Sequence, residues 1–436
     1  MHQIKHIGWR VTMAGLGINL ALGILYSWSI FKMAIKDSIT SGNGIFNWHL
    51  SALNDPYAVC CLVFAFTMIF AGRVQDRLSP RITAVIGGIL TGMGLILISF
   101  SNAWISWIIG FGLFMGMGLG FGYASAIPPA IKWFPPARTG MIAGIVVAGF
   151  GLASAYIAPL SVFLIERVGL SQSMLIFGIA FLVIICALAQ CLTNPPEGYV
   201  FENAFQPSGF VSPGLIDFSP GEMLRTPAFY QVWVIFCIAS GAGLMIIGSV
   251  AGMAKQGMGS TVWTVVALIA VGNAFGRVVA GLLSDRIGWA NTLFIMLMFQ
   301  SVVIFSLLFI PSTQVFLLVL AATVIGFNYG TSLSLFPCAT RDYFGMKNFG
   351  VNYGLVFSAW GVGGFIFPRV SQMIVAYADS PEIAYILASG LLLNGAVIAL
   401  MTRSPVIETR KQPDVIIAPV PENIRAYAMQ ELKSIK

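Results

Sequence analysis

Charged side chains are scarce in this sequence. Only 9% of its 436 residues are Asp, Glu, Lys or Arg, while 58% are hydrophobic. Ordinary soluble domains contain about 25% charged residues. This shortage excludes a soluble globular protein and indicates an integral membrane protein.

Residues that perform catalysis are equally scarce inside the apolar segments. The sequence has three histidines, all in the amino terminus or the first loop, and it contains no HExxH pattern. None of the sixteen acidic residues falls in the middle of a long apolar run. An intramembrane enzyme needs such groups to activate a nucleophile or hold a metal. We therefore predict that the protein is not an enzyme and has no cofactor and no metal site.

Long apolar runs dominate the chain instead. A membrane crossing needs about 20 mostly apolar residues, and continuous runs favour helices over the alternating strands of a barrel. We predict an all-α polytopic membrane protein with twelve transmembrane helices. The expected helices lie near residues 11–33, 53–72, 82–99, 104–130, 140–165, 170–191, 229–252, 260–283, 289–310, 315–337, 351–374 and 383–402.

The distribution of basic residues predicts the orientation of these helices. The net charge of +7 could suggest a nucleic-acid partner, but most of the basic residues lie in the amino terminus, the loops after even-numbered helices and the tail. This is the positive-inside bias of membrane proteins. We predict a multi-pass protein of the inner or plasma membrane with both termini in the cytoplasm, the lipid bilayer as a partner and no nucleic-acid partner.

A proline-rich hydrophilic stretch between Asn194 and Arg225 divides the predicted helices into two groups of six. We predict an amino-terminal six-helix bundle over residues 1–193 and a cytoplasmic linker over 194–226. A carboxyl-terminal six-helix bundle follows over 227–402, and a cytoplasmic tail over 403–436. Repeated halves are typical of secondary transporters, whose substrate site lies near the midplane between the halves.

A short motif repeats in the two predicted bundles. Glycine in GxxxDR allows a neighbouring helix to approach closely, and the Asp and Arg can pair with each other, a helix end or an adjacent helix. We assign the motifs to conformational gating, with ordinary cytoplasmic loop charges as the alternative. The two copies are 209 positions apart and consist of Gly72, Asp76, Arg77, Gly281, Asp285 and Arg286.

Together with the paired motifs, four segments resemble a known family over essentially the whole chain. They are INLALGILYSWSIF, GFGYASAIPPAIKWFP, NAFGR and NYGLVFSAWG. The chain resembles the major facilitator superfamily, and within it the oxalate:formate antiporter and monocarboxylate transporter branch. The resemblance implies two pseudo-symmetric six-helix bundles and a cavity lined by helices 1, 4, 7, 8, 10 and 11. It also implies a small organic anion as substrate, enclosed by aromatic residues.

Arg277 is the only charged residue between Lys255 and Asp285. An arginine in the middle of a spanning helix costs about 2.5 to 3.5 kcal/mol and normally faces a cavity or the protein interior. The repeat places Met68 at the equivalent position, so the charge occurs in one half only, as expected of a substrate ligand. We predict that Arg277 binds a carboxylate through its planar guanidinium. A structural arginine bonded to backbone carbonyls is the alternative.

Other candidate ligands lie on the helices that the resemblance assigns to the cavity. Asn273 shares a helical face with Arg277, three tyrosines offer hydroxyls, and two aromatic residues could form an apolar wall. Interhelical packing is the alternative for each. The predicted substrate-binding residues are Arg277, Asn273, Tyr123, Tyr329, Tyr26, Phe357 and Trp360.

Two departures from the resembling family bear on the substrate and the coupling. Trp360 stands where oxalate exchangers carry a lysine, and Asn273 stands where proton-coupled monocarboxylate transporters carry an aspartate. One fixed positive charge would neutralise a monocarboxylate but leave a dicarboxylate with an unpaired charge. Asp55 is the nearest acidic alternative as a proton carrier, although a helix cap explains it equally well.

The sequence thus predicts a secondary active transporter of small monocarboxylates such as lactate or pyruvate, acting as a monomer by alternating access. Proton symport is what the resemblance implies, with a co-transported proton as second substrate. Oxalate:formate-type anion exchange is the alternative. The two-half repeat and the single buried charge favour alternating access over a channel or a receptor that does not transport.

Overall fold

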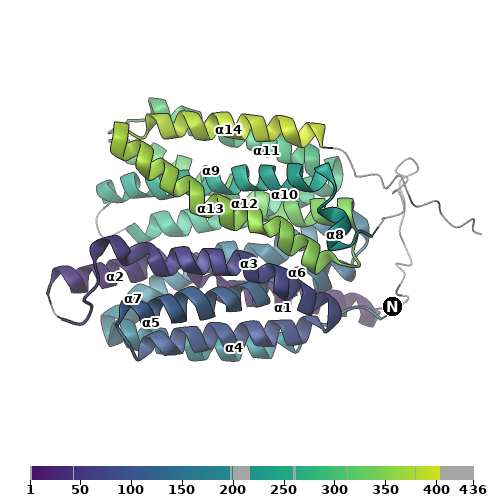
Figure 1. The fold of residues 1–436 in the computed structure, drawn as a ribbon, viewed down its shortest axis with the longest axis horizontal. Coiled ribbons are helices and arrows are strands. Elements are labelled where there is room, and N and C mark those ends of the chain that lie inside the picture. Colours follow the sequence, from purple (N-terminus) through teal and green to yellow (C-terminus); the bar gives the residue numbers. More distant parts are fainter. Residues whose placement is uncertain are drawn as a thin grey trace, which may run out of the picture. The chain divides into compact units, whose positions relative to one another are not determined.

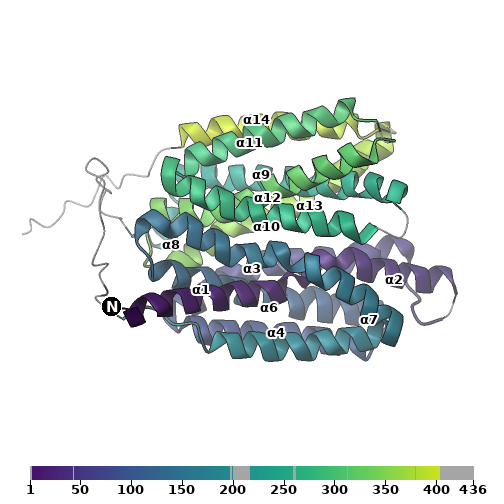
Figure 2. The same ribbon diagram turned by 180° about the vertical axis from the view of Figure 1, so that it is seen from behind.

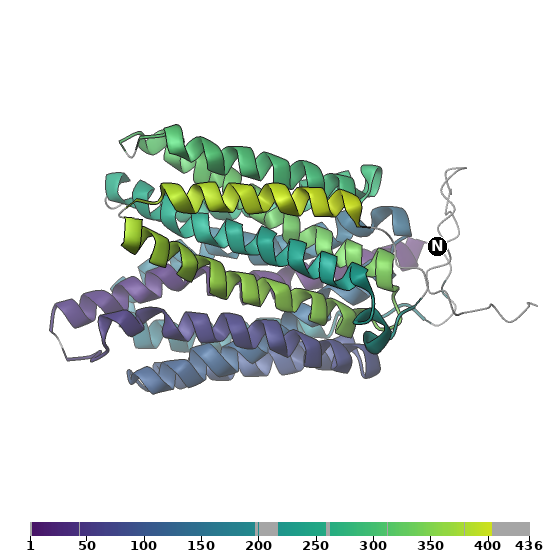
Figure 3. The ribbon, with the colours of Figure 1, turned by 45° about the horizontal axis from the view of Figure 1, so that its top comes forward.

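The computed structural model describes residues 2–42, 44–196, 199, 217–258, 262–311, 313–378 and 380–402. The predicted tail and most of the predicted linker lie outside these ranges. Within them the chain is almost entirely helical and contains no β-strand, which agrees with the all-α prediction. The helices run lengthwise beside one another (Figures 1 and 3).

The helices that precede the linker are coloured purple to blue in Figure 1, and those that follow it are teal to yellow. The helices of one compact unit are α1 (His2–Leu22), α2 (Trp28–Thr40), α3 (Asp55–Arg77), α4 (Pro80–Ser99), α5 (Trp104–Trp107), α6 (Gly116–Lys132), α7 (Thr139–Ala189), α8 (Pro220–Met223), α9 (Pro227–Met258), α10 (Val262–Ile287), α11 (Trp289–Ser306), α12 (Val315–Phe344), α13 (Phe349–Ala378) and α14 (Glu382–Met401). The predicted domain boundaries at 193 and 227 stay predictions.

Eleven helical segments in the described part of the chain are long and apolar enough to cross a membrane. One of them, spanning 136–189, has 54 residues. At about 1.5 Å per residue it is far longer than the roughly 30 Å thickness of the hydrocarbon core. Gly169 interrupts it with a φ of 80°, a backbone conformation that favours glycine. This segment therefore contains two of the twelve predicted crossings, and α7 is two helices joined by a bend.

The two arms of α7 pack against different neighbours. A Cβ added to Gly149 would lie 2.3 Å from the Leu16 carbonyl oxygen of α1, and one added to Gly178 would lie 3.1 Å from the Gly92 carbonyl oxygen of α4. In Figure 2 the arms meet in the region labelled α7. The first arm packs against α1 and α10, and the second arm packs against α4.

The first predicted helix, 11–33, is also interrupted. A short 3-10 helix, η1 (Gly23–Ser27), separates α1 from α2. Gly23 packs so closely on α7 that an added Cβ would lie 2.5 Å from the Phe150 carbonyl oxygen. Stretches of 3-10 geometry within a helix often mark functional positions, and this one carries Tyr26.

Candidate substrate site

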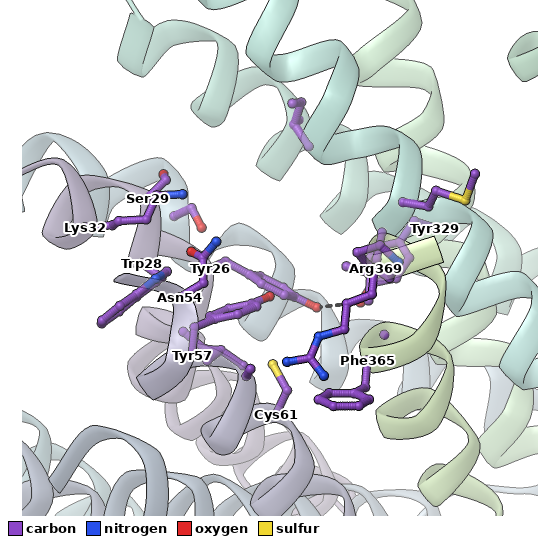
Figure 4. Close-up of a pocket in the computed structure, with 18 of the residues that line it drawn as sticks. Tyr26, Trp28, Ser29, Lys32, Asn54, Tyr57, Cys61, Tyr329, Phe365 and Arg369 are labelled. Carbon is purple, nitrogen blue, oxygen red and sulfur yellow. Dashed lines mark hydrogen bonds between the residues drawn. The ribbon is translucent and has the colours of Figure 1, made fainter. Parts of the chain in front are cut away.

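A large cavity opens at one end of the helical bundle. Its volume is about 840 Å³. Its walls come from η1, α2, the short 3-10 helix η2 (Leu50–Asn54), α3, α7, α9, α10, α12 and α13. We call it the vestibule. It contacts the first residues of α3, including Asp55 and Cys61, whereas the GxxxDR motif of that helix lies at its other end. The vestibule thus lies at the end of α3 opposite its GxxxDR motif. Figure 4 shows part of its lining, including Asn54, Tyr57 and Cys61.

A second, much smaller cavity lies beside Arg277. Its volume is about 10 Å³, which is room for roughly one water molecule. We call it the Arg277 chamber. Its walls are Tyr26, Phe64, Tyr123, Phe150, Arg277, Leu333, Phe357 and Trp360.

Three aromatic residues lie between the vestibule and the Arg277 chamber. The Tyr26 and Tyr329 hydroxyl oxygens are 3.1 Å apart, and the Trp360 indole N–H donates to the Tyr329 oxygen at 2.7 Å. Tyr26 and Trp360 line both cavities, and Tyr329 lines the vestibule. We call these three residues the aromatic layer. Figure 4 shows its hydrogen bond between Tyr26 and Tyr329.

Arg277 is fully buried on α10. Its Nε donates to Asn273 Oδ1 at 2.8 Å, and its Nη1 donates to the Val147 carbonyl oxygen of α7. Its Nη2 is buried and has no hydrogen-bond partner among the described residues. A buried donor without a partner is costly, more so on a charged group. Asn273 and the Val147 carbonyl thus bind Nε and Nη1, while Nη2 has no partner at hydrogen-bond distance in the described ranges and the Tyr26 hydroxyl lies near the guanidinium.

Glycines of α7 make room for the Asn273–Arg277 pair. A Cβ on Gly151 would lie 2.7 Å from Asn273 Oδ1 and 3.1 Å from Arg277 Nε, and a Cβ on Gly144 would lie 2.5 Å from the Arg277 carbonyl oxygen. Any larger residue would push the two helices apart. Gly144 and Gly151 thus bring α7 close enough for the Val147 carbonyl to reach the guanidinium.

The structure brings the seven predicted substrate ligands together. Five of them line the Arg277 chamber, Asn273 binds Arg277, and Tyr329 binds Tyr26 and Trp360. Phe357 contacts Tyr123 and stacks on Trp360, with ring centroids 5.3 Å apart in each pair. That these residues bind substrate stays a prediction.

Sequence reasoning missed other residues around Arg277. Phe64, Phe150 and Leu333 complete the chamber wall, and the Val147 carbonyl binds the guanidinium. The internal repeat held the signal. The motif offset of 209 moves Asn273 back to Phe64. Gly140 and Gly151 match Gly350 and Gly361 at an offset of 210, which moves Trp360 back to Phe150. The repeat thus connects Phe64 and Phe150 with two of the predicted ligands.

The GxxxDR motifs form two equivalent contacts at the end opposite the vestibule. A Cβ on Gly72 would lie 2.1 Å from the Gly350 carbonyl oxygen, and one on Gly281 would lie 2.1 Å from the Gly140 carbonyl oxygen. Each glycine therefore allows backbone contact between helices from different sequence halves. The motifs hold α3 against α13 and α10 against α7.

The motif aspartates bind the starts of these neighbouring helices. Asp76 accepts from the backbone N–H groups of Gly350 and Val351, both at 3.0 Å. Asp285 accepts in the same way from Gly140 at 2.7 Å and Met141 at 2.8 Å. A carboxylate at a helix N-terminus satisfies N–H groups that lack intrahelical partners and complements the helix dipole. The sequence left three possible partners for each motif aspartate: the motif arginine, a helix end or an adjacent helix. In the structure each aspartate binds the first backbone N–H groups of an adjacent helix.

Replacing Asp285 with asparagine should weaken this closed end. Asparagine loses the charge and one of the two acceptors, so the contact should lose about 1 to 3 kcal/mol. We expect the initial rate of substrate uptake to fall several-fold. Asp37→Asn makes the same change at an exposed position of α2 and should leave the rate unchanged. Equal rates for the two variants would contradict a role of Asp285 in holding this end closed.

Comparison with known proteins places the chain in a family. The model of the Major Facilitator Superfamily matches residues 12–368. The chain belongs to the Major Facilitator Superfamily. It is a multi-pass membrane transporter of this superfamily and not an enzyme.

Relatives and solved structures within the superfamily cover most of the chain. The oxalate:formate antiporter of Oxalobacter formigenes is 25% identical over 353 residues, which are 80% of this chain and 80% of that protein. Monocarboxylate transporter 11 of Mus musculus is 23% identical over 407 residues, covering 90% and 86% of the two chains. The crystal structure of the human organic anion transporter MFSD10 matches with a TM-score of 0.67 at 13% identity, over 90% of this chain and 99% of that one. That structural match shows the shared fold.

Proposed function

We propose that the protein is a secondary active transporter of small monocarboxylates and that Arg277 binds the substrate carboxylate. The observation that carries this proposal is the unpaired Nη2 of Arg277, fully buried beside a small chamber between the sequence halves. An anion at Nη2 would remove the cost of the unpaired donor. The oxalate:formate antiporter and the monocarboxylate transporter among the relatives support an organic anion as substrate.

The composition of the chamber supports one carboxylate over two. Arg277 is the charged residue among the eight that line it, and Trp360 provides an indole where a second cation would be needed. A second carboxylate would lie against Phe64, Phe150 and Phe357 without a counter-charge. Burying an uncompensated charge costs several kcal/mol. Lactate and pyruvate therefore fit the chamber better than oxalate.

The two cavities suggest how the substrate enters. The chamber as it stands holds about one water, so a carboxylate reaching Nη2 must displace the aromatic layer. The anion enters the vestibule, the Tyr26–Tyr329 contact opens, and the anion pairs with Arg277. The layer then closes behind it. Release requires the α3–α13 and α10–α7 contacts at the other end to separate, which is the gating role of the GxxxDR motifs. From the positive-inside bias we expect the vestibule to open on the outer side of the membrane.

The proposal also concerns the ion to which transport of the carboxylate is coupled. We favour proton symport, as in the monocarboxylate transporters that the sequence resembles. The acidic residue lining the vestibule is Asp55, at the first position of α3, and Asn273 takes the place of an acid next to Arg277. Oxalate:formate-type exchange is the second candidate, because the antiporter relative covers four fifths of the chain and exchange needs no proton-carrying residue.

Transport by purified protein in liposomes tests the function and the coupling together. We would measure uptake of radiolabelled lactate, pyruvate, acetate, formate and oxalate, each driven by an inward proton gradient or by internal unlabelled anion. We expect saturable uptake of monocarboxylates that the proton gradient accelerates. Acceleration by internal anion alone would favour exchange. Binding without uptake of any acid in the panel would refute the transport of monocarboxylates.

A further inference from the structure

We propose that the vestibule contains a separate recruitment site, centred on Arg369, that attracts carboxylates and raises the rate at which they reach Arg277. This inference rests on the proposed function because it assumes an anionic substrate. It concerns a different residue, at a different depth, and predicts a different kinetic effect.

The position of Arg369 makes it part of the entrance route. Arg369 follows Trp360 of the aromatic layer by nine residues on α13, which is about 13 Å along a helix. Both residues line the vestibule, together with Gly364, Phe365 and Pro368 from the helix between them. One wall of the vestibule thus runs from Arg369 down to the aromatic layer. An anion bound at Arg369 has no further charged barrier to cross on this wall.

The guanidinium of Arg369 is held in place without being neutralised. Its Cζ lies 3.8 Å from the centroid of the Phe365 ring, a favourable contact between a cation and an aromatic face. Within the described ranges, no carboxylate lies within 4.0 Å of it. Figure 4 shows the side chain extending into the cavity between Cys61 and Phe365. The ring covers one side of the guanidinium and leaves its remaining N–H groups for an incoming carboxylate.

The charges of the whole vestibule favour an anion. Its described lining contains two basic residues, Lys32 on α2 and Arg369 on α13, and one acidic residue, Asp55. A cleft lined by an excess of one charge focuses the field and increases association rates by about tenfold or more. Screening acts over roughly 10 Å at 0.1 M salt. The contribution of Arg369 should therefore be strong at low ionic strength and weak at high ionic strength.

The chain provides a matched control for Arg369. Arg167 on α7 also lies over a phenylalanine four residues earlier, with its Cζ 5.7 Å from the Phe163 ring centroid. It is exposed and does not line the vestibule. A change of Arg167 removes the same charge and the same type of contact at a site outside the entrance route.

The test compares uptake kinetics of lactate and pyruvate for Arg369→Gln, Arg369→Lys and Arg167→Gln at low and high ionic strength. We expect Arg369→Gln to lower kcat/KM about threefold to tenfold at low ionic strength, with kcat unchanged and little effect at high ionic strength. Arg369→Lys keeps the charge and should keep most of kcat/KM. Arg167→Gln should behave as the unmodified protein.

Two outcomes would overturn the recruitment site. One is an Arg369→Gln variant with the kcat/KM of Arg167→Gln at both ionic strengths. The other is an Arg369→Lys variant as impaired as Arg369→Gln, because a steering charge does not depend on guanidinium shape. Failure of the proposed function looks different, since it would show as retained uptake in Arg277→Gln, whatever Arg369→Gln does.

Discussion

Uptake of monocarboxylates should be abolished when Arg277 is replaced with glutamine. Glutamine removes the only charge among the described residues of the chamber wall, and breaking a buried charge pair costs about 3 to 5 kcal/mol. Because about 1.4 kcal/mol corresponds to a tenfold change in affinity, binding should weaken by roughly two to three and a half orders of magnitude. The measurement is initial uptake of labelled lactate and pyruvate into liposomes that contain the purified variant.

Loss of uptake in this variant must be separated from loss of folding. In the structure Nη2 of Arg277 has no partner in the described part of the chain, so the ligand-free protein bears the cost of a buried, incompletely paired charge. Arg277→Gln should therefore unfold at the same temperature as the unmodified protein or at a higher one. Arg277→Lys keeps the charge but lacks the planar fork. We expect its uptake rate to lie between those of the unmodified protein and Arg277→Gln. Transport at the normal rate by Arg277→Gln would contradict the proposal that Arg277 binds the substrate carboxylate.

The second large effect is expected from Gly281→Ala. A Cβ at this position would lie 2.1 Å from the Gly140 carbonyl oxygen and 2.6 Å from the Gly140 carbonyl carbon, distances that backbone atoms cannot tolerate. Overpacking of this kind costs about 1 to 3 kcal/mol. The cost applies to conformations in which α10 touches α7, so the population should shift roughly tenfold or more away from the state with an open vestibule. Transport should fall by a similar factor because the cycle requires both states.

Thiol labelling reports this shift directly. Cys61 lines the vestibule and is 8% exposed, so a small thiol reagent should label it slowly in the present state and still more slowly when the vestibule closes. In a background in which the other cysteines are replaced, Gly281→Ala should reduce the labelling rate of Cys61. Gly390→Ala is the control, because a Cβ on this glycine of α14 meets no atom within 4 Å. Faster or unchanged labelling in Gly281→Ala would contradict closure by the GxxxDR contact.

The sequence predicts the fold and the centre of the site because these depend on long-range patterns with few exceptions. A charge in an apolar helix is rare and expensive, so Arg277 stands out from its neighbours. The paired GxxxDR motifs recur at one spacing, and their glycines do lie at close backbone contacts between helices. Tyr123 and Tyr329 occupy similar places in the two halves, and both belong to the region around Arg277.

Other features could not be predicted because nothing local distinguishes them. Phe64 and Phe150 are two of 33 phenylalanines, and only the repeat connects them with the site. Arg369 lies near the end of an apolar run, where basic residues usually belong to ordinary loops. Its position on the vestibule wall depends on the tertiary packing of α13. The closed aromatic layer is a property of one conformation, which no sequence pattern records.

The most direct test of the account is an experimental structure of the protein with a transported monocarboxylate bound. The account predicts a carboxylate oxygen within hydrogen-bond distance of Arg277 Nη2, in a chamber enlarged between Tyr26, Tyr123 and Phe357. An anion bound only at Arg369 in the vestibule, with the Arg277 chamber still closed and Nη2 still unpaired after saturation with substrate, would contradict it.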